Sequence, residues 1–316
     1  MKKILLLILT LVSLNGFAQT EGRDFKAIDE YIKGLGAMEG MSTATINNVV
    51  INHFDDKIDK LRAIYTWIAL NITYDIKAAR TGNTQKSKSA DVLATRRAVG
   101  LGFANLFQDM CSSANIRCLT VDGFVKNNIN DIGDRATDPN HTWIVVQLGQ
   151  SPDTWYYVDP AWGSGYPDAD MKTFTKSFSG AYFFPDKGVF NMQHFPVNEA
   201  WRLGPGPRGK KDFYSLPLIK VSAIENGMKK CEPNDGRLKA RVTKQVFFTY
   251  VLNGKEEVTK VSLVIGEKKK LKQKDVDFVY TGGTLNFSYK FEEEGNFPLT
   301  VLVNGREFIT YSAEIE

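Results

Sequence analysis

His141 and Asp159 are residues whose types and order along the chain could do chemistry together. His141 opens the apolar run HTWIVV, and Asp159 closes the next apolar run, WYYVD. Two adjacent strands can bring such side chains within hydrogen-bond distance, so that the carboxylate orients the imidazole and the imidazole takes a proton from a thiol. The pattern indicates the base and the orienting group of a cysteine acyl-transfer site, whose thiol is expected at a helix N-terminus.

Hydrophobic periodicity predicts the elements that must position these residues. Apolar residues repeat with helical spacing from Asp55 to Ile72 and from about Val99 to Ala114, and the second helix should be central and buried on one side. Three strand-like runs follow at 117–126, 141–148 and 155–159. This order predicts a domain that mixes helices with a sheet.

Four segments of the chain resemble, in the same order, four motifs of the transglutaminase-like superfamily. They are the helix at 62–68, TRRAVGLGFANLF at 95–107, NHTW at 140–143 and VDPAWG at 158–163. An aromatic tail at 182–201 resembles the kyphoscoliosis-peptidase-like branch, and the whole resemblance covers roughly residues 57–203. It implies an α+β fold with a transglutaminase-like (papain-type) core, in which a central helix packs on an antiparallel sheet.

The resemblance fails at one position. Residues 102–104 fix the register of the second motif, and this register puts Gly100 where the family has its catalytic cysteine. Cys111 cannot replace that cysteine, because it lies about 16 Å further along the helix at about 1.5 Å per residue. Loss of the nucleophile lowers the kcat of a protease by about 10⁶. The resemblance therefore implies a degenerate triad, in which His141 and Asp159 remain without the family's covalent chemistry.

The former active-site cleft gives three hypotheses for function. In the first, Gly100, His141, Asp159 and Trp162, with Trp143 beside them, form a site without catalysis, cofactor or metal, which binds a peptide or a cell-envelope component. In the second, the chain is an enzyme: a cysteine peptidase or transglutaminase, if the glycine is a change from an active parent, or a hydrolase in which His141 and Asp159 activate water. In the third, the histidine and aspartate support the sheet and the tryptophans are core aromatics.

The N-terminus predicts export. Lys2 and Lys3 precede the apolar run 4–12, and Gly16 and Ala18 are small residues before a cleavage site at Gln19, which is the pattern of a signal peptide at 1–18. We expect a periplasmic or secreted protein, with no integral membrane segment after cleavage. The net charge of the whole chain is +4 and two of these charges lie in the signal peptide, so nucleic acid is not implied as a partner.

The three cysteines leave two readings open. An odd count outside the cytoplasm leaves at least one thiol unpaired. Cys111 and Cys118 could form a disulfide if their helix and strand bring them together, or both could be small buried apolar residues.

The last third of the chain changes in character. We expect a transglutaminase-like domain at 19–203, a linker rich in glycine and proline at 204–215, and a small Ig-like β-sandwich at 216–316, because short alternating strands recur there around turns such as Asn304-Gly305. His194 and Trp201 are expected to pack the linker onto the core. The lysine run at 268–274 is expected to be a solvated strand edge or loop.

Overall fold

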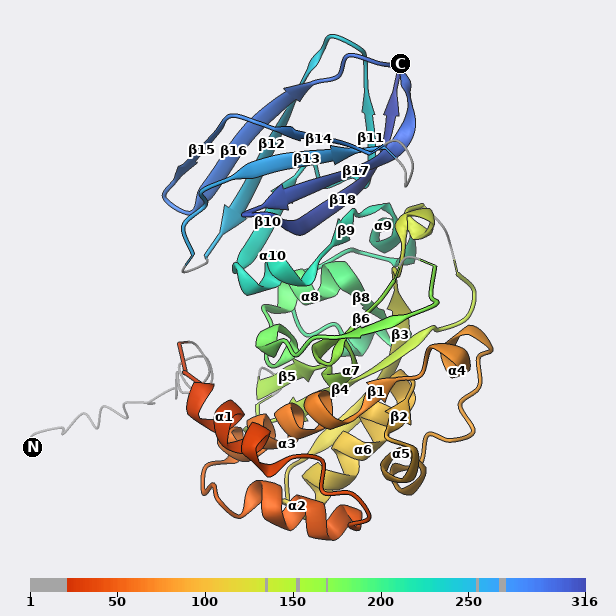
Figure 1. The fold of residues 1–316 in the computed structure, drawn as a ribbon, viewed down its shortest axis with the longest axis vertical. Coiled ribbons are helices and arrows are strands. Elements are labelled where there is room, and N and C mark those ends of the chain that lie inside the picture. The colour runs from red at the N-terminus through yellow and green to blue at the C-terminus, as the bar shows by residue number, and fades with distance from the viewer. Residues whose placement is uncertain (1–21, 134–135, 152–153, 169, 254–255, 267–270) are drawn as a thin grey trace, which may run out of the picture.

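The computed structural model describes residues 22–133, 136–151, 154–168, 170–253, 256–266 and 271–316. The predicted signal peptide lies outside these residues. The lower part of the molecule combines helices with a small sheet, and the upper part consists mainly of sheets (Figure 1). Among the described residues, no helix is long and apolar enough to cross a membrane.

Helices cover one side of the lower part. They are α1 (Lys26–Leu35), α2 (Thr43–Ile51), α3 (Lys57–Asn71), α4 (Ile76–Arg80), α5 (Ser89–Thr95) and α6 (Gly100–Ser113). Asp56 is the N-cap of α3, and its carboxylate accepts hydrogen bonds from the backbone N–H groups of Ile58 and Asp59. The helices predicted at 55–72 and 99–114 correspond to α3 and α6, with ends within two residues.

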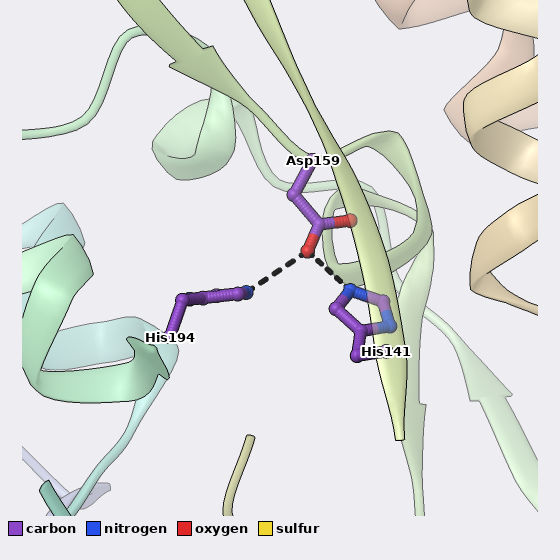
Figure 2. A group of neighbouring side chains, drawn as sticks. All are labelled: His141, Asp159 and His194. Atoms are coloured by element: carbon purple, nitrogen blue, oxygen red, sulfur yellow. Dashed lines mark hydrogen bonds and ion pairs between the residues drawn. The ribbon is translucent and has the colours of Figure 1, made fainter. Parts of the chain in front are cut away.

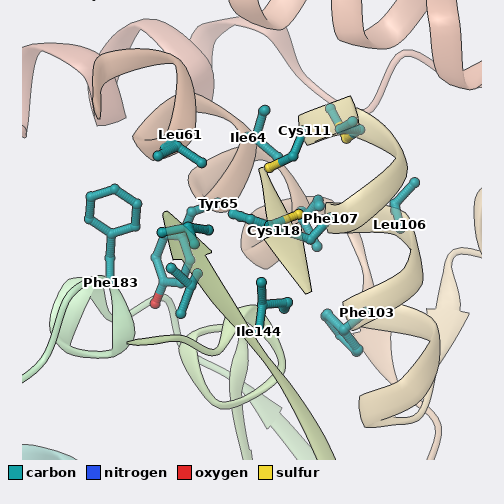
Figure 3. Close-up of a cluster of buried hydrophobic side chains, with 14 of the residues drawn as sticks. Leu61, Ile64, Tyr65, Phe103, Leu106, Phe107, Cys111, Cys118, Ile144 and Phe183 are labelled. Carbon is teal, nitrogen blue, oxygen red and sulfur yellow. The ribbon is translucent and has the colours of Figure 1, made fainter. Parts of the chain in front are cut away.

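A four-stranded antiparallel sheet in the order β5-β4-β3-β8 positions the site. Its strands are β3 (Cys118–Val125), β4 (His141–Gln147), β5 (Trp155–Val158) and β8 (His194–Pro196). Helix α6 packs on β3 and β4, and Figure 3 shows the apolar side chains between the helix and the sheet. The α+β class and the central helix on an antiparallel sheet are confirmed.

Short elements complete the lower part and connect it to the upper part. They are β1 (Thr73–Tyr74), β2 (Arg97–Ala98), η1 (Ile129–Asp131), α7 (Pro160–Gly163), β6 (Gly165–Pro167), β7 (Phe174–Lys176), η3 (Gly180–Tyr182), α8 (Lys187–Gln193), η4 (Glu199–Trp201), α9 (Lys210–Ser215), β9 (Leu218–Ile219) and α10 (Val221–Glu225). All three cysteines are free and buried, and Cys111 and Cys118 belong to the same apolar cluster between α6 and β3.

Two sheets with a shared apolar core form the upper part. One has the order β10-β12-β16-β15: β10 (Met228–Glu232), β12 (Gln245–Leu252), β15 (Phe278–Thr281) and β16 (Thr284–Lys290). The other has the order β11-β18-β17-β13-β14, with β9 beside β18: β11 (Arg237–Ala240), β13 (Val261–Ile265), β14 (Lys272–Asp275), β17 (Gly295–Val303) and β18 (Arg306–Ile315). The predicted sandwich is therefore present. Of the lysine run at 268–274, residues 268–270 lie outside the described residues. Lys272 and Lys274 lie on β14 and form ion pairs with Glu293 and Glu292.

The segment 204–215, which we expected as a linker, includes the buried side chains of α9. Phe213 and Tyr214 pack with Phe124 and Phe195 of the lower part. Lys126 lies beside them, and its Nζ donates hydrogen bonds to the carbonyl oxygens of Phe213 (2.7 Å) and Met192 (3.4 Å). A lysine is thus buried where the two parts of the chain meet.

Burial gives Lys126 a pH-dependent effect on stability. Desolvation lowers its pKa to about 7, whereas an unfolded lysine titrates near about 10.4. Between these values the unfolded chain binds more protons than the folded chain, so the free energy of unfolding rises with pH in this window. From pH 7 to pH 9 we expect a gain of about 2 kcal/mol in the native chain relative to Lys126→Met, measured by chemical denaturation. An equal pH dependence in both proteins would contradict this expectation.

Candidate functional site

Three side chains meet at the ends of three strands (Figure 2). The Oδ2 atom of Asp159 lies 2.7 Å from Nε2 of His141 and 3.1 Å from Nε2 of His194. The other carboxylate oxygen, Oδ1, accepts a hydrogen bond of 3.0 Å from the backbone N–H of Trp162. Asp159 is the N-cap of α7, and Pro160 at the first helical position favours the start of this helix directly after β5.

The protonation of this cluster follows from its surroundings. Burial alone would raise the pKa of Asp159, but the charge and hydrogen bond of His141, together with the hydrogen bond of His194, hold it well below its usual range. Burial lowers the pKa of His194 to about 4, so this histidine is neutral at pH 7. An ionised carboxylate can only accept hydrogen bonds, and therefore both Nε2 atoms carry a proton that points at Oδ2.

The other nitrogen of His141 faces the start of α6. A Cβ atom built on Gly100 would lie 2.6 Å from Nδ1 and 2.8 Å from Cε1 of His141, and 3.1 Å from the carbonyl oxygen of Thr142. The imidazole thus occupies space that any larger residue at position 100 would need. Because β4 pairs with β3 in the register that sets His141 opposite Gly123, this ring is carried into place by the sheet.

Aromatic rings surround the cluster. His194 stacks on Phe190, with ring centroids 3.8 Å apart and an interplanar angle of 4°, and its ring also contacts Trp162 at 4.5 Å and Trp143 at 5.1 Å. Trp143 is buried in the core, whereas Trp162 is only partly buried. The side chains of His141, Asp159 and His194 are 3%, 0% and 0% exposed, so the polar cluster is closed to solvent.

Trp162 also lines a large groove. It has a volume of about 2090 Å³ and is lined by the lower part, including Trp162 and Tyr182, and by the upper part, including Lys272 and Pro298. Of the predicted site residues, Trp162 is the one that connects the polar cluster with this groove, because its ring lies 6.0 Å from that of His141. The structure brings Gly100, His141 and Asp159 together, next to Trp162.

The cluster also has the composition of a metal site. His141, Asp159 and His194 offer three ligand atoms within 4.8 Å of one another. Both Nε2 atoms lie at hydrogen-bond distance from the same carboxylate oxygen, 2.7 Å for His141 and 3.1 Å for His194. Direct hydrogen bonds therefore account for the observed arrangement.

His194 is the site residue that sequence reasoning assigned to a different place. We expected it to pack the linker onto the core, but its Nε2 atom faces Asp159 and its ring is fully buried. The position was missed because His194 lies on β8, which pairs with the distant strand β3. The one available signal was that His194 belongs to the aromatic tail that already resembled the family.

Comparison with known proteins shows which sequences and structures the chain resembles. Residues 44–160 match the Transglutaminase-like superfamily. The chain is 31% identical to human kyphoscoliosis peptidase over 251 residues, which is 76% of this chain and 37% of that protein. It is 26% identical to the Caenorhabditis elegans "Lim and transglutaminase domain protein ltd-1", over 62% of this chain and 28% of that protein. A crystal structure titled as a TGase shares 19% identity over 47% of this chain and 35% of its own, with a TM-score of 0.28.

The chain therefore belongs to the transglutaminase-like superfamily. Within it, the chain lies in the branch of kyphoscoliosis peptidase, as the aromatic tail predicted. It spans less than half the length of these curated relatives, so their activities and partners bear on this chain only as proposals.

Proposed function

We propose that this chain is an exported, non-catalytic transglutaminase-like protein that binds an extended peptide in the groove beside Trp162. The observation that carries the proposal is the contact between Gly100 and His141. A cysteine at position 100 would need its Cβ atom where the imidazole now approaches to 2.6 Å. The site thus lacks the nucleophile of the family and has closed over its position.

The groove supports a binding role. It is open, lies between the two parts of the chain, and exposes both apolar and polar groups, which is the usual character of a ligand site. Trp162 offers a large aromatic surface, and such side chains contribute strongly to binding when a ligand covers them. An extended peptide is the favoured ligand because the relative with the higher identity is named a peptidase. A periplasmic or secreted location follows from the predicted signal peptide.

A hydrolase is the second candidate. It is favoured by the intact hydrogen bond between His141 and Asp159, which is the arrangement that a general base requires. Water would have to reach Nδ1 of His141, although this side chain is 3% exposed. Closure of the cluster therefore favours binding over hydrolysis.

Binding can be tested with a random peptide library and, separately, with glycan–peptide fragments of the cell envelope. We expect peptides to bind. The Trp162→Ala substitution should lower the affinity for the selected peptide by about tenfold or more, as measured by calorimetry. The matched control is Phe247→Ala, since Phe247 is 71% exposed on β12 and does not contact the site cluster. The proposal is wrong if no peptide is selected, or if both variants weaken binding equally.

A further inference from the structure

The carboxylate of Asp159 receives donors from three different elements. His141 approaches from β4, the N–H of Trp162 from α7, and His194 from β8. Because Oδ1 already accepts from Trp162, Oδ2 serves both histidines. The orientation of the carboxylate is therefore fixed by donors on three different elements.

His194 is well suited to hold Oδ2 in place. Its ring is 0% exposed and lies parallel to the ring of Phe190 at 3.8 Å, while Trp162 and Trp143 contact its other sides. The pairing of His194 with Val125 fixes the backbone from which the ring projects. A ring held on all these sides cannot turn away from the carboxylate without moving its neighbours.

We propose that His194 is a positioning residue: it holds Oδ2 of Asp159 so that His141 keeps its Nε2–H on the carboxylate and presents Nδ1 to position 100. His194 acts through Asp159, since its Nε2 is directed at Oδ2. As a neutral donor, it adds a hydrogen bond without adding a positive charge, and the carboxylate keeps its full attraction for the Nε2–H of His141. This role does not depend on the proposed peptide binding.

The sequence makes the proposal directly measurable, because it contains three histidines. In ¹⁵N-labelled protein, each imidazole can be assigned with one variant per histidine. His194→Phe keeps an aromatic ring on Phe190 but removes the donor, and His194→Gln restores an N–H donor without the ring. His53→Phe is the matched control, because His53 is exposed and stacks on Tyr31 at 4.0 Å, away from the cluster.

We expect the Nε2 proton of His141 to exchange with water about tenfold faster or more in His194→Phe, and to return toward the native rate in His194→Gln. His53→Phe should leave this rate unchanged. A packing role alone predicts the opposite order, with His194→Phe close to native and His194→Gln most disturbed, and that result would overturn the proposal. If neither variant folds, the unmodified protein still decides: at pH 7 the ¹⁵N shift of Nε2 of His194 must be that of a protonated nitrogen, and an unprotonated Nε2 would overturn the proposal.

Discussion

Gly100→Cys is expected to create a thiol that an iodoacetamide probe labels, and to make this labelling depend on His141. The new Sγ atom extends from a Cβ atom next to Nδ1 of His141, and it lies at the first residue of α6, where backbone N–H groups favour a thiolate. Position 100 is buried as well, so the expected difference comes from the neighbouring imidazole: labelling at pH 7 should be faster than at Cys111 and Cys231, whose thiol pKa values are raised by burial. It should fall by about tenfold or more when His141→Gln is added. The measurement is the labelling rate by mass spectrometry.

Gly100→Ala is the matched control, because it separates the steric effect of an added Cβ atom from the reactivity of the thiol. Its Cβ atom meets the same imidazole at 2.6 Å but brings no thiol, so it should lower the free energy of unfolding by about 1–3 kcal/mol without new reactivity. Gly100→Cys should be destabilised by a similar amount. If the labelling of Gly100→Cys is insensitive to His141→Gln, the imidazole does not face position 100 in the way the structure shows.

Asp159→Asn is expected to have the largest effect on stability, about 3 kcal/mol. Asp159 is fully buried and accepts from His141, His194 and the N–H of Trp162. An asparagine amide offers only one acceptor oxygen, so its NH₂ group must face one of these donors. In addition, the two histidines lose the negative charge of the carboxylate to which they now donate hydrogen bonds. The free energy of unfolding at pH 7 measures this effect.

Asp122→Asn is the control for removing a carboxylate from the same sheet. Asp122 is exposed and accepts one hydrogen bond of 2.7 Å, from the hydroxyl of Thr142. The Asp122→Asn substitution should lower the free energy of unfolding by less than about 1 kcal/mol. Equal losses in the two variants would mean that the buried cluster adds nothing beyond an ordinary surface hydrogen bond.

The elements that carry the site could be predicted because their signals are local. Apolar periodicity located α3 and α6 within two residues, and the strands that begin with His141 and end before Asp159 were predicted in their observed order. The motif register put Gly100 at the start of the second predicted helix, and in the structure it is the first residue of α6, beside His141. These features depend on residues that are close together in the sequence, so a local pattern is enough to predict them.

The rest depends on contacts between distant segments. The hydrogen bond from His194 to Asp159 requires β8 to pair with β3, and a three-residue strand has no periodicity to predict that pairing. The groove beside Trp162 exists because the upper part of the chain stands against the lower part, with α9 and the buried Lys126 between them. No local pattern contains this arrangement.

The most direct test of the central claim is a turnover assay of the unmodified chain. Purified protein is incubated with fluorogenic peptides, and in parallel with a glutamine-containing protein and a labelled amine, beside its His141→Gln variant. We predict no peptide cleavage and no amine incorporation above the level of that variant, because no nucleophile stands before Nδ1 of His141. Turnover by the unmodified chain that disappears in His141→Gln would contradict the account.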